Sequence, residues 1–213
     1  AAQQINLIRN DTVHTTKEII TNCQALYKQF LACKTPLPDS LPARLLNLEG
    51  TYHSDNKDFK QAILKTHEAY NYLNGQSNEI LGRICFNLGF YYNLTNDLAQ
   101  AQFYYLKATK HKKNPADQAQ CFKAAADLAY FLGDYEQGVK TAQKSIETIE
   151  ASNLPYQMAD AYNILGVNLN KLNQYERAQA ALQKAEYYYQ QWLKSSPQKE
   201  FVLAPAIQLN LGN

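Results

Sequence analysis

The chain lacks the residues and patterns that mark most catalytic and membrane-spanning proteins. Its 213 residues include one Met, one Trp, four Cys and eight Gly. It contains no run of about 18 apolar residues, the length that a membrane-spanning helix needs. No glycine-rich loop is available to cradle a phosphate, and no Ser or Cys stands in a nucleophile motif. We therefore expect neither an active site nor membrane insertion in this segment.

The cysteines show no pattern typical of metal binding. Cys23, Cys33, Cys85 and Cys121 form no C-x-x-C pair, and no His stands at zinc-finger spacing from them. The favoured interpretation is four buried free thiols that pack as small apolar residues in a reducing, cytoplasmic compartment. A disulfide between helices stays open as the alternative for an exported, extracytoplasmic protein. The four His are scattered, and we expect no metal ion and no cofactor.

Charge is nearly balanced, which gives no reason to expect a nucleic-acid or anionic-membrane partner. Lys and Arg total 21 against 19 Asp and Glu, a net charge of +2. The carboxylates are predicted to be surface charges. The basic run at residues 110–113 is predicted to be a solvated helix C-terminus. Tyr104–Tyr105 and Tyr187–Tyr189 are predicted, together with Trp192, to pack between helices rather than to stack on bases.

A hairpin of two short amphipathic helices is the pattern that the chain does contain. It is clearest from Ala161 to Ala185, with a turn at Asn173–Tyr175. Gly166 and Ala178 stand twelve residues apart, one on each predicted helix, where two backbones can approach closely because neither side chain is bulky.

The same pair of small residues recurs along the chain with matching spacing. The offset within each copy is twelve, and successive copies are separated by 39, 37 and 40 residues in both series. A double match of this kind indicates a structural repeat. The first-helix positions are Gly50, Gly89, Ala126 and Gly166, and the second-helix positions are Ala62, Ala101, Gly138 and Ala178.

We therefore predict one α-solenoid domain over residues 1–213. It comprises an N-terminal helix of a degenerate unit at 10–34, repeats at 43–74, 80–113, 117–151 and 157–194, and the start of a truncated fifth repeat at 200–213. The first residue is Ala, so either a signal has been removed or the chain is a segment of a longer protein. The unpaired fifth helix favours a protein that continues.

The repeat resembles the tetratricopeptide repeat family. The residues that carry the resemblance are Leu165-Gly166, Tyr175, Ala178, Leu182 and Ala185, Leu88-Gly89, Tyr92, Ala101, Tyr105 and Ala108, and Gly133-Asp134-Tyr135-Glu136. Glu49, His53 and Ala125-Ala126 depart from the family pattern, and the spacing exceeds the usual length of about 34 residues. Long spacing of this kind is similar to that of bacterial signalling members. The resemblance implies an all-α, right-handed superhelix of antiparallel helix pairs, with the first helices lining a concave face.

First-helix residues expected to face the concave groove form the candidate site. An Asn amide can both donate to and accept from a peptide backbone, an Arg can hold a carboxylate through two hydrogen bonds, and aromatic residues can form apolar pockets. The candidates are Arg44, Asn47, Arg83, Phe86, Phe90, Asn93, Lys123, Asp127, Tyr130, Asn163, Asn170 and Lys171.

The resemblance implies a non-catalytic module that binds a peptide or protein segment in its groove. The expected setting is the sensory or regulatory part of a bacterial signalling protein. Two alternatives remain at this point. The segment could be a structural scaffold that mediates self-association as a homodimer. It could also be the accessory repeat region of an enzyme, such as a diguanylate cyclase or kinase, whose catalytic domain lies outside it.

Overall fold

The described part of the chain is built from helices and short connections. The computed structural model describes residues 15–32, 40–73, 79–152 and 154–195, and these ranges contain no strand. The all-α repeat fold expected from the sequence is thus confirmed. The helices are α2 (Thr16–Ala32), α3 (Ser40–Asp55), α4 (Phe59–Tyr72), α5 (Glu79–Leu94), α6 (Leu98–Thr109), α7 (Pro115–Phe131), α8 (Tyr135–Ile149), the 3₁₀ turn η1 (Glu150–Ser152), α9 (Pro155–Lys171) and α10 (Tyr175–Ser195).

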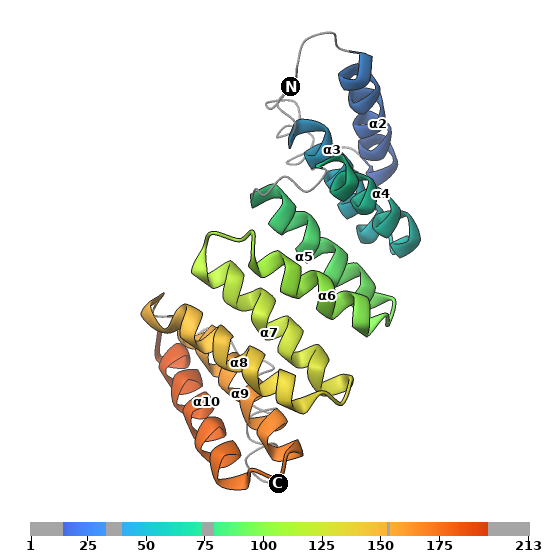
Figure 1. The fold of residues 1–213 in the computed structure, drawn as a ribbon. Coiled ribbons are helices and arrows are strands. Elements are labelled where there is room, and N and C mark those ends of the chain that lie inside the picture. The colour runs from blue at the N-terminus through green and yellow to red at the C-terminus, as the bar shows by residue number, and fades with distance from the viewer. Residues whose placement is uncertain (1–14, 33–39, 74–78, 153, 196–213) are drawn as a thin grey trace. The chain divides into compact units, whose positions relative to one another are not determined.

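From α3 onward, consecutive helices pair as antiparallel hairpins: α3 with α4, α5 with α6, α7 with α8, and α9 with α10 (Figure 1). The chain divides into two compact units, Ala1–His111 and Lys112–Asn213. We call them the N-terminal unit, which holds α2 to α6, and the C-terminal unit, which holds α7 to α10. Helix α2 packs on α3. The predicted start of a fifth repeat, the N-terminal cap candidates before residue 15, and Cys33 lie outside the described residues.

All four hairpin turns have the same backbone conformation. One residue in each turn has a positive φ, between 58° and 78°, and three of the four are not glycine. This left-handed conformation reverses the chain within a few residues, so the two helices of a hairpin lie close together. The residues are Lys57, Asn96, Gly133 and Asn173. Their separations of 39, 37 and 40 residues repeat the spacing of the small residues.

An aspartate follows the left-handed residue in three of these turns and caps the second helix. Each Asp Oδ1 accepts a hydrogen bond at 3.2 Å from the backbone N–H of the Gln three residues later. These bonds satisfy an N–H that has no partner inside the helix. The pairs are Asp58 with Gln61, Asp97 with Gln100, and Asp134 with Gln137.

Small residues allow close contact inside two hairpins, as their spacing predicts. A Cβ added to Gly166 would lie 3.3 Å from the Ala178 carbonyl oxygen and 2.6 Å from Leu182 Cγ. A Cβ on Gly50 would lie 3.1 Å from the carbonyl oxygen of Ala62. Gly138 is small for a different reason, because a Cβ there would collide with Asn168 of α9, in the next hairpin.

The described cysteines are buried free thiols, as predicted. Cys23, Cys85 and Cys121 lie in the core without a disulfide. Burial raises the pKa of Cys23 and of Cys85 to about 12. Both side chains therefore remain protonated and unreactive at neutral pH while the protein is folded.

Glu49 contradicts the prediction that the carboxylates are surface charges. Its side chain is 2% exposed and points from α3 towards the neighbouring helices α2 and α4. Gln24 Nε2 donates to Glu49 Oε1 at 2.8 Å, and Lys65 Nζ lies 3.9 Å from the same oxygen. A carboxylate can be buried here because a donor and a cation on neighbouring helices offset its lost hydration.

The tyrosines divide between core and surface. Tyr104, Tyr105 and Tyr189 are buried, which confirms the predicted packing role for these three. Tyr187 is 58% exposed, so the packing prediction is wrong there.

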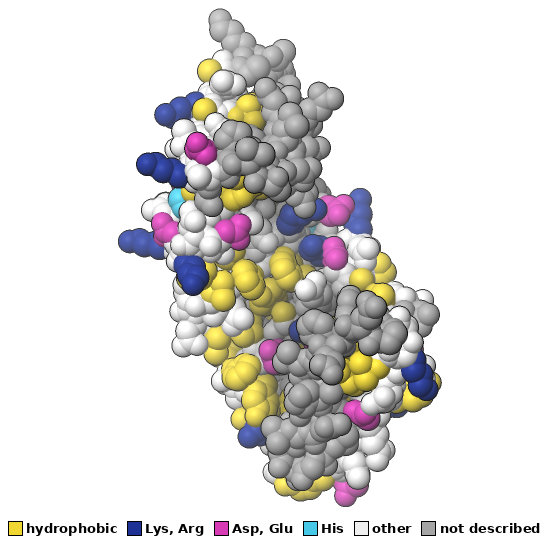
Figure 2. All heavy atoms as spheres, turned by 180° about the vertical axis from the view of Figure 1, so that it is seen from behind, with side chains coloured by type: hydrophobic (Ala, Val, Ile, Leu, Met, Phe, Trp, Pro, Cys, Tyr) yellow, Lys and Arg dark blue, Asp and Glu magenta, His cyan; other side chains and the backbone are white. Residues whose placement is uncertain are grey.

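Figure 2 shows basic and acidic side chains interspersed on the face drawn, together with apolar patches. No helix of the described ranges is long and apolar enough to cross a bilayer.

Candidate functional site

A groove in the N-terminal unit lies between α3 and α5, the first helices of two consecutive hairpins. Its cavity volume is about 760 Å³, within the range of small-ligand and peptide pockets. Residues one helical turn apart on each helix line it. They are Arg44, Asn47, Leu48, Thr51, Tyr52 and Asp55 of α3, and Glu79, Ile80, Arg83 and Asn87 of α5. We call this cavity the α3–α5 groove.

Two hydrogen bonds connect α3 to α5 beside this groove and fix their register. Asn87 Nδ2 donates to Asn47 Oδ1 at 3.0 Å, and the Tyr91 hydroxyl donates to Thr51 Oγ1 at 3.4 Å. Both bonds join residues 40 positions apart. The amide pair uses one acceptor of Asn47 and one donor of Asn87. Each amide has further donor and acceptor sites, so the pair can still bind a backbone N–H or C=O.

Arg44 and Arg83 supply the two positive charges of the groove lining. The hydrogen-bonded residues Asn47 and Asn87 are 40 positions apart in the sequence. Arg83 follows Arg44 by 39 positions, so the two arginines lie at about the same level on the two helices. Within the described residues, neither guanidinium has a hydrogen bond or ion pair. A guanidinium offers five N–H donors in a planar fork that matches a carboxylate. Both guanidinium groups therefore line the cavity with their N–H donors unused by the described residues.

Acidic residues mark the two ends of the groove. Glu79 lies at the start of α5 and Asp55 at the end of α3, and both line the cavity. Because α3 and α5 run in the same direction, the arginines lie between Glu79 and the Asn47–Asn87 pair. The groove is therefore polar along its length, with its cationic part nearer the starts of the two helices.

The other predicted residues of α5 lie outside this groove. The Phe86 ring packs edge-to-face on Tyr105 of α6, with 5.4 Å between ring centroids. Phe90 is 42% exposed and contacts Tyr91, and Asn93 is exposed near the end of the helix.

The sequence analysis did not identify Asn87 as a groove residue. A register of 40 rather than 39 between the first two repeats would have identified it as the partner of Asn47.

The predicted residues of the C-terminal unit form a second polar site between α7 and α9. Lys123 Nζ donates to Asp160 Oδ2 at 2.9 Å beside a cavity of about 260 Å³. Burial lowers the Lys123 pKa, but the attraction and hydrogen bond of Asp160, together with Asp127 and Tyr156, outweigh it, so the pKa is raised. Burial raises the pKa of Asp127, and Lys123 opposes that rise. Lys123 is already paired with Asp160, whereas neither arginine of the α3–α5 groove has an ion-pair partner among the described residues.

The remaining candidates are structural neighbours of that site. Lys171 Nζ lies 5.5 Å from the ring centre of Tyr130, a cation–π contact between α9 and α7. Asn163 is 9% exposed, and Asn170 is half-buried in the last turn of α9. Across the described residues, no group of three or more His, Cys, Asp or Glu side chains could hold a metal ion.

Stacked helical hairpins with a polar groove on their first helices define an α-helical repeat protein of the protein-interaction class. The tetratricopeptide repeat family model matches residues 82–115 and 159–191, which supports that family for this chain. The first match covers most of the α5–α6 hairpin, and the second covers most of α9–α10. No curated protein matches the sequence.

Several solved structures share the fold at low sequence identity. BtubC (BKLC) from P. vanneervenii is 12% identical, with a TM-score of 0.76 over 94% of this chain and 84% of that chain. YrrB, described as a TPR protein with an unusual peptide-binding site, is 18% identical, with a TM-score of 0.61 over 91% and 84%. The apo form of RapI is 19% identical, with a TM-score of 0.69 over 88% of this chain and 52% of that chain. Similarity at this identity shows the fold alone.

Proposed function

We propose that the chain binds an extended peptide segment of a partner protein in the α3–α5 groove, with a ligand carboxylate held by Arg44 and Arg83. The observation that carries the proposal is the pair of guanidinium groups that line one cavity and have no partner among the described residues. An exposed ion pair contributes little to binding, whereas a bidentate Arg–carboxylate pair in a concave site contributes more.

The groove also suits the backbone of an extended peptide. The Asn47–Asn87 pair has hydrogen-bonding capacity left, and it lies about one helical turn from Arg44 and from Arg83. A ligand could thus place a carboxylate on the arginines and its next peptide groups over the amides. The similarity to YrrB, which has a peptide-binding site, supports this assignment.

We further propose that the segment serves as the sensory or regulatory part of a larger bacterial signalling protein. The support is the long repeat spacing, which is similar to that of bacterial signalling members of the tetratricopeptide repeat family. In this setting, peptide binding in the groove would change how hairpins pack on one another and would be read by another part of the protein.

The test is selection of a displayed random-peptide library on the immobilised chain. Selected peptides are then synthesised and their affinity is measured by fluorescence anisotropy. We expect enrichment of Asp, Glu or a free C-terminal carboxylate, and a loss of affinity of about tenfold or more for Arg44→Ala/Arg83→Ala. The control is Arg177→Ala, an exposed arginine of α10 that contacts Gln174. Selected peptides without a carboxylate, or equal affinity for the double variant, would contradict the proposal.

A further inference from the structure

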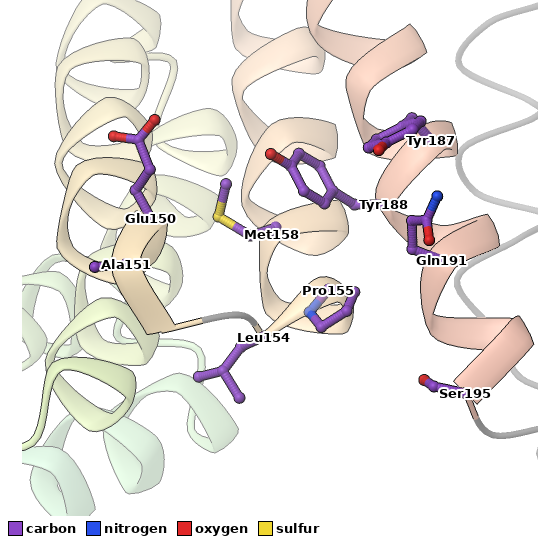
Figure 3. A pocket seen from close by; sticks show the side chains of 9 residues that line it. All are labelled: Glu150, Ala151, Leu154, Pro155, Met158, Tyr187, Tyr188, Gln191 and Ser195. Carbon is purple, nitrogen blue, oxygen red and sulfur yellow. The ribbon is translucent and has the colours of Figure 1, made fainter.

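A second cavity lies in the C-terminal unit, away from the predicted groove residues. Its volume is about 600 Å³, and it is bounded by the end of α8, η1, the start of α9 and one face of α10. Figure 3 shows Glu150 on one wall, Tyr187 on the opposite wall, and Tyr188 beside Met158 between them. We call it the η1 cavity. Its lining residues are Glu150, Ala151, Leu154, Pro155, Met158, Tyr187, Tyr188, Gln191 and Ser195.

The η1 cavity has aromatic walls. Tyr187 is 58% exposed and packs edge-to-face on Tyr188, with 5.3 Å between ring centroids. Tyr188 stacks on Tyr162 at 5.7 Å, which uses one face of its ring. Burial raises the Tyr188 pKa, Tyr162, Tyr187 and Glu150 add to the rise, and Lys184 opposes it. The phenol therefore remains neutral, with an electron-rich ring, at neutral pH.

The lining of the η1 cavity also carries one negative charge, that of Glu150, and no positive charge. Glu150 is exposed and has no hydrogen bond or ion pair among the described residues. The end of α8 and the start of α9 both border the cavity, and their helix-end partial charges, about half a unit each and opposite in sign, nearly cancel. Pro155, the first residue of α9, also has no N–H to present to an anion. The full charge of Glu150 is therefore the net charge of the cavity lining, and the cation Lys184, which also acts on Tyr188, lies outside that lining.

A neighbouring contact shows that a tyrosine ring beside the cavity accepts a cation. Lys184 Nζ lies 5.2 Å from the ring centre of Tyr162, the ring stacked on Tyr188. An electron-rich ring attracts a cation, and a guanidinium can also stack on it as a flat group. Met158 and Leu154 provide an apolar surface for the methylene stem of a long side chain.

We propose that the η1 cavity binds an arginine side chain presented by a partner protein, with the guanidinium held by Glu150 and the rings of Tyr187 and Tyr188. The site lies on helices other than those of the α3–α5 groove and requires a ligand of opposite charge. It does not depend on peptide binding in that groove.

The experiment uses Nα-acetyl-arginine amide as the probe and Nα-acetyl-citrulline amide, its neutral isostere, as the comparison. Each is titrated into the ¹⁵N-labelled chain and followed by NMR chemical shifts. We expect chemical-shift changes at residues of η1 and α10. The citrulline compound should bind at least about fivefold more weakly than the arginine compound. Glu150→Gln and Tyr187→Ala should each weaken arginine binding about fivefold, because each removes one exposed cation contact.

Two control variants distinguish binding in the η1 cavity from a general effect of charge. Glu136→Gln makes the same charge change on α8 at its opposite, exposed end and should leave affinity unchanged. Arg44→Ala should also leave it unchanged. Equal binding of the two probes, no detectable binding, or full affinity in Glu150→Gln would overturn the proposal. Self-association of the wild-type chain that Glu150→Gln abolishes would instead identify a second copy as the occupant and would also overturn it.

Discussion

At the scale of single residues, His67 combines burial with a specific partner. It lies on α4, where its ring contacts Tyr70, Tyr92 and Tyr104, and its Nε2 is 2.8 Å from the Tyr92 hydroxyl. Burial lowers its pKa below the ordinary value of 6.5. The unfolded chain therefore binds a proton here more readily than the folded chain does.

The pH dependence follows from that sign. The contribution of His67 to stability is fully present above about pH 6.5 and is lost as the pH falls towards the lowered folded-state pKa. We expect the wild type to lose more free energy of unfolding between pH 7.5 and pH 5 than His67→Gln, whose amide can still bond to Tyr92. Urea denaturation at both pH values measures this difference. Parallel losses in the two proteins would contradict the assignment.

Single residues also show what the sequence could not determine. The helical pattern identified the helices, but not which face each residue would present to a neighbouring helix. Glu49 is buried because Gln24 and Lys65 come from two other helices, and sequence spacing cannot show such a meeting. Asn87 was missed because α3 and α5 align with an offset of 40, whereas the small residues suggested 39.

At the scale of elements, the hairpin turn is the regular unit of the molecule. In all four turns the residue after the left-handed position accepts a backbone hydrogen bond from the residue four positions later, at 2.9 to 3.0 Å. Three of these residues are aspartates that also cap the helix through the side chain. The fourth is Gln174, whose Oε1 accepts instead from the Arg177 side chain. The turns were predictable because local residues alone determine them.

Replacing Gln174 with Asp should supply the missing cap. We expect Gln174→Asp to raise the free energy of unfolding by about 0.5–1 kcal/mol, because an Asp side chain can satisfy a free N–H of α10. Asp134→Ala should lower the free energy of unfolding by about 1 kcal/mol, because it removes the side chain that caps α8. Urea denaturation followed by circular dichroism measures both changes. Gln174→Asn, which can cap without a charge, separates the hydrogen bond from attraction to the helix dipole. A Gln174→Asp variant no more stable than wild type would show that α10 does not need the cap.

At the scale of the whole molecule, buried thiols distributed along the chain report on local opening. Cys23 lies in α2, which packs on α3, whereas Cys85 lies in α5, which packs against α3, α4 and α6. In a repeat protein each element is stabilised by its immediate neighbours. Helix α2 should therefore open more often than α5.

Alkylation of the native protein with iodoacetamide at pH 8, read by mass spectrometry, tests this order. A Cys33→Ser background limits labelling to the three described thiols. We expect Cys23 to react about tenfold faster than Cys85, which corresponds to a difference of about 1.4 kcal/mol in opening free energy. Equal rates, each matching that of global unfolding, would show that α2 and α5 open together.

The two kinds of connection in this chain have different evolutionary freedom. Within hairpins, the turn has a fixed backbone conformation and a cap, so a one-residue insertion would break both. Between hairpins, the connections contain six, five and five residues, without this shared turn in their described part, and one of them includes η1 beside a cavity that the repeat itself does not require. Insertions and deletions should therefore collect between hairpins in related sequences. New recognition sites could arise there without any change to the helices that maintain the fold.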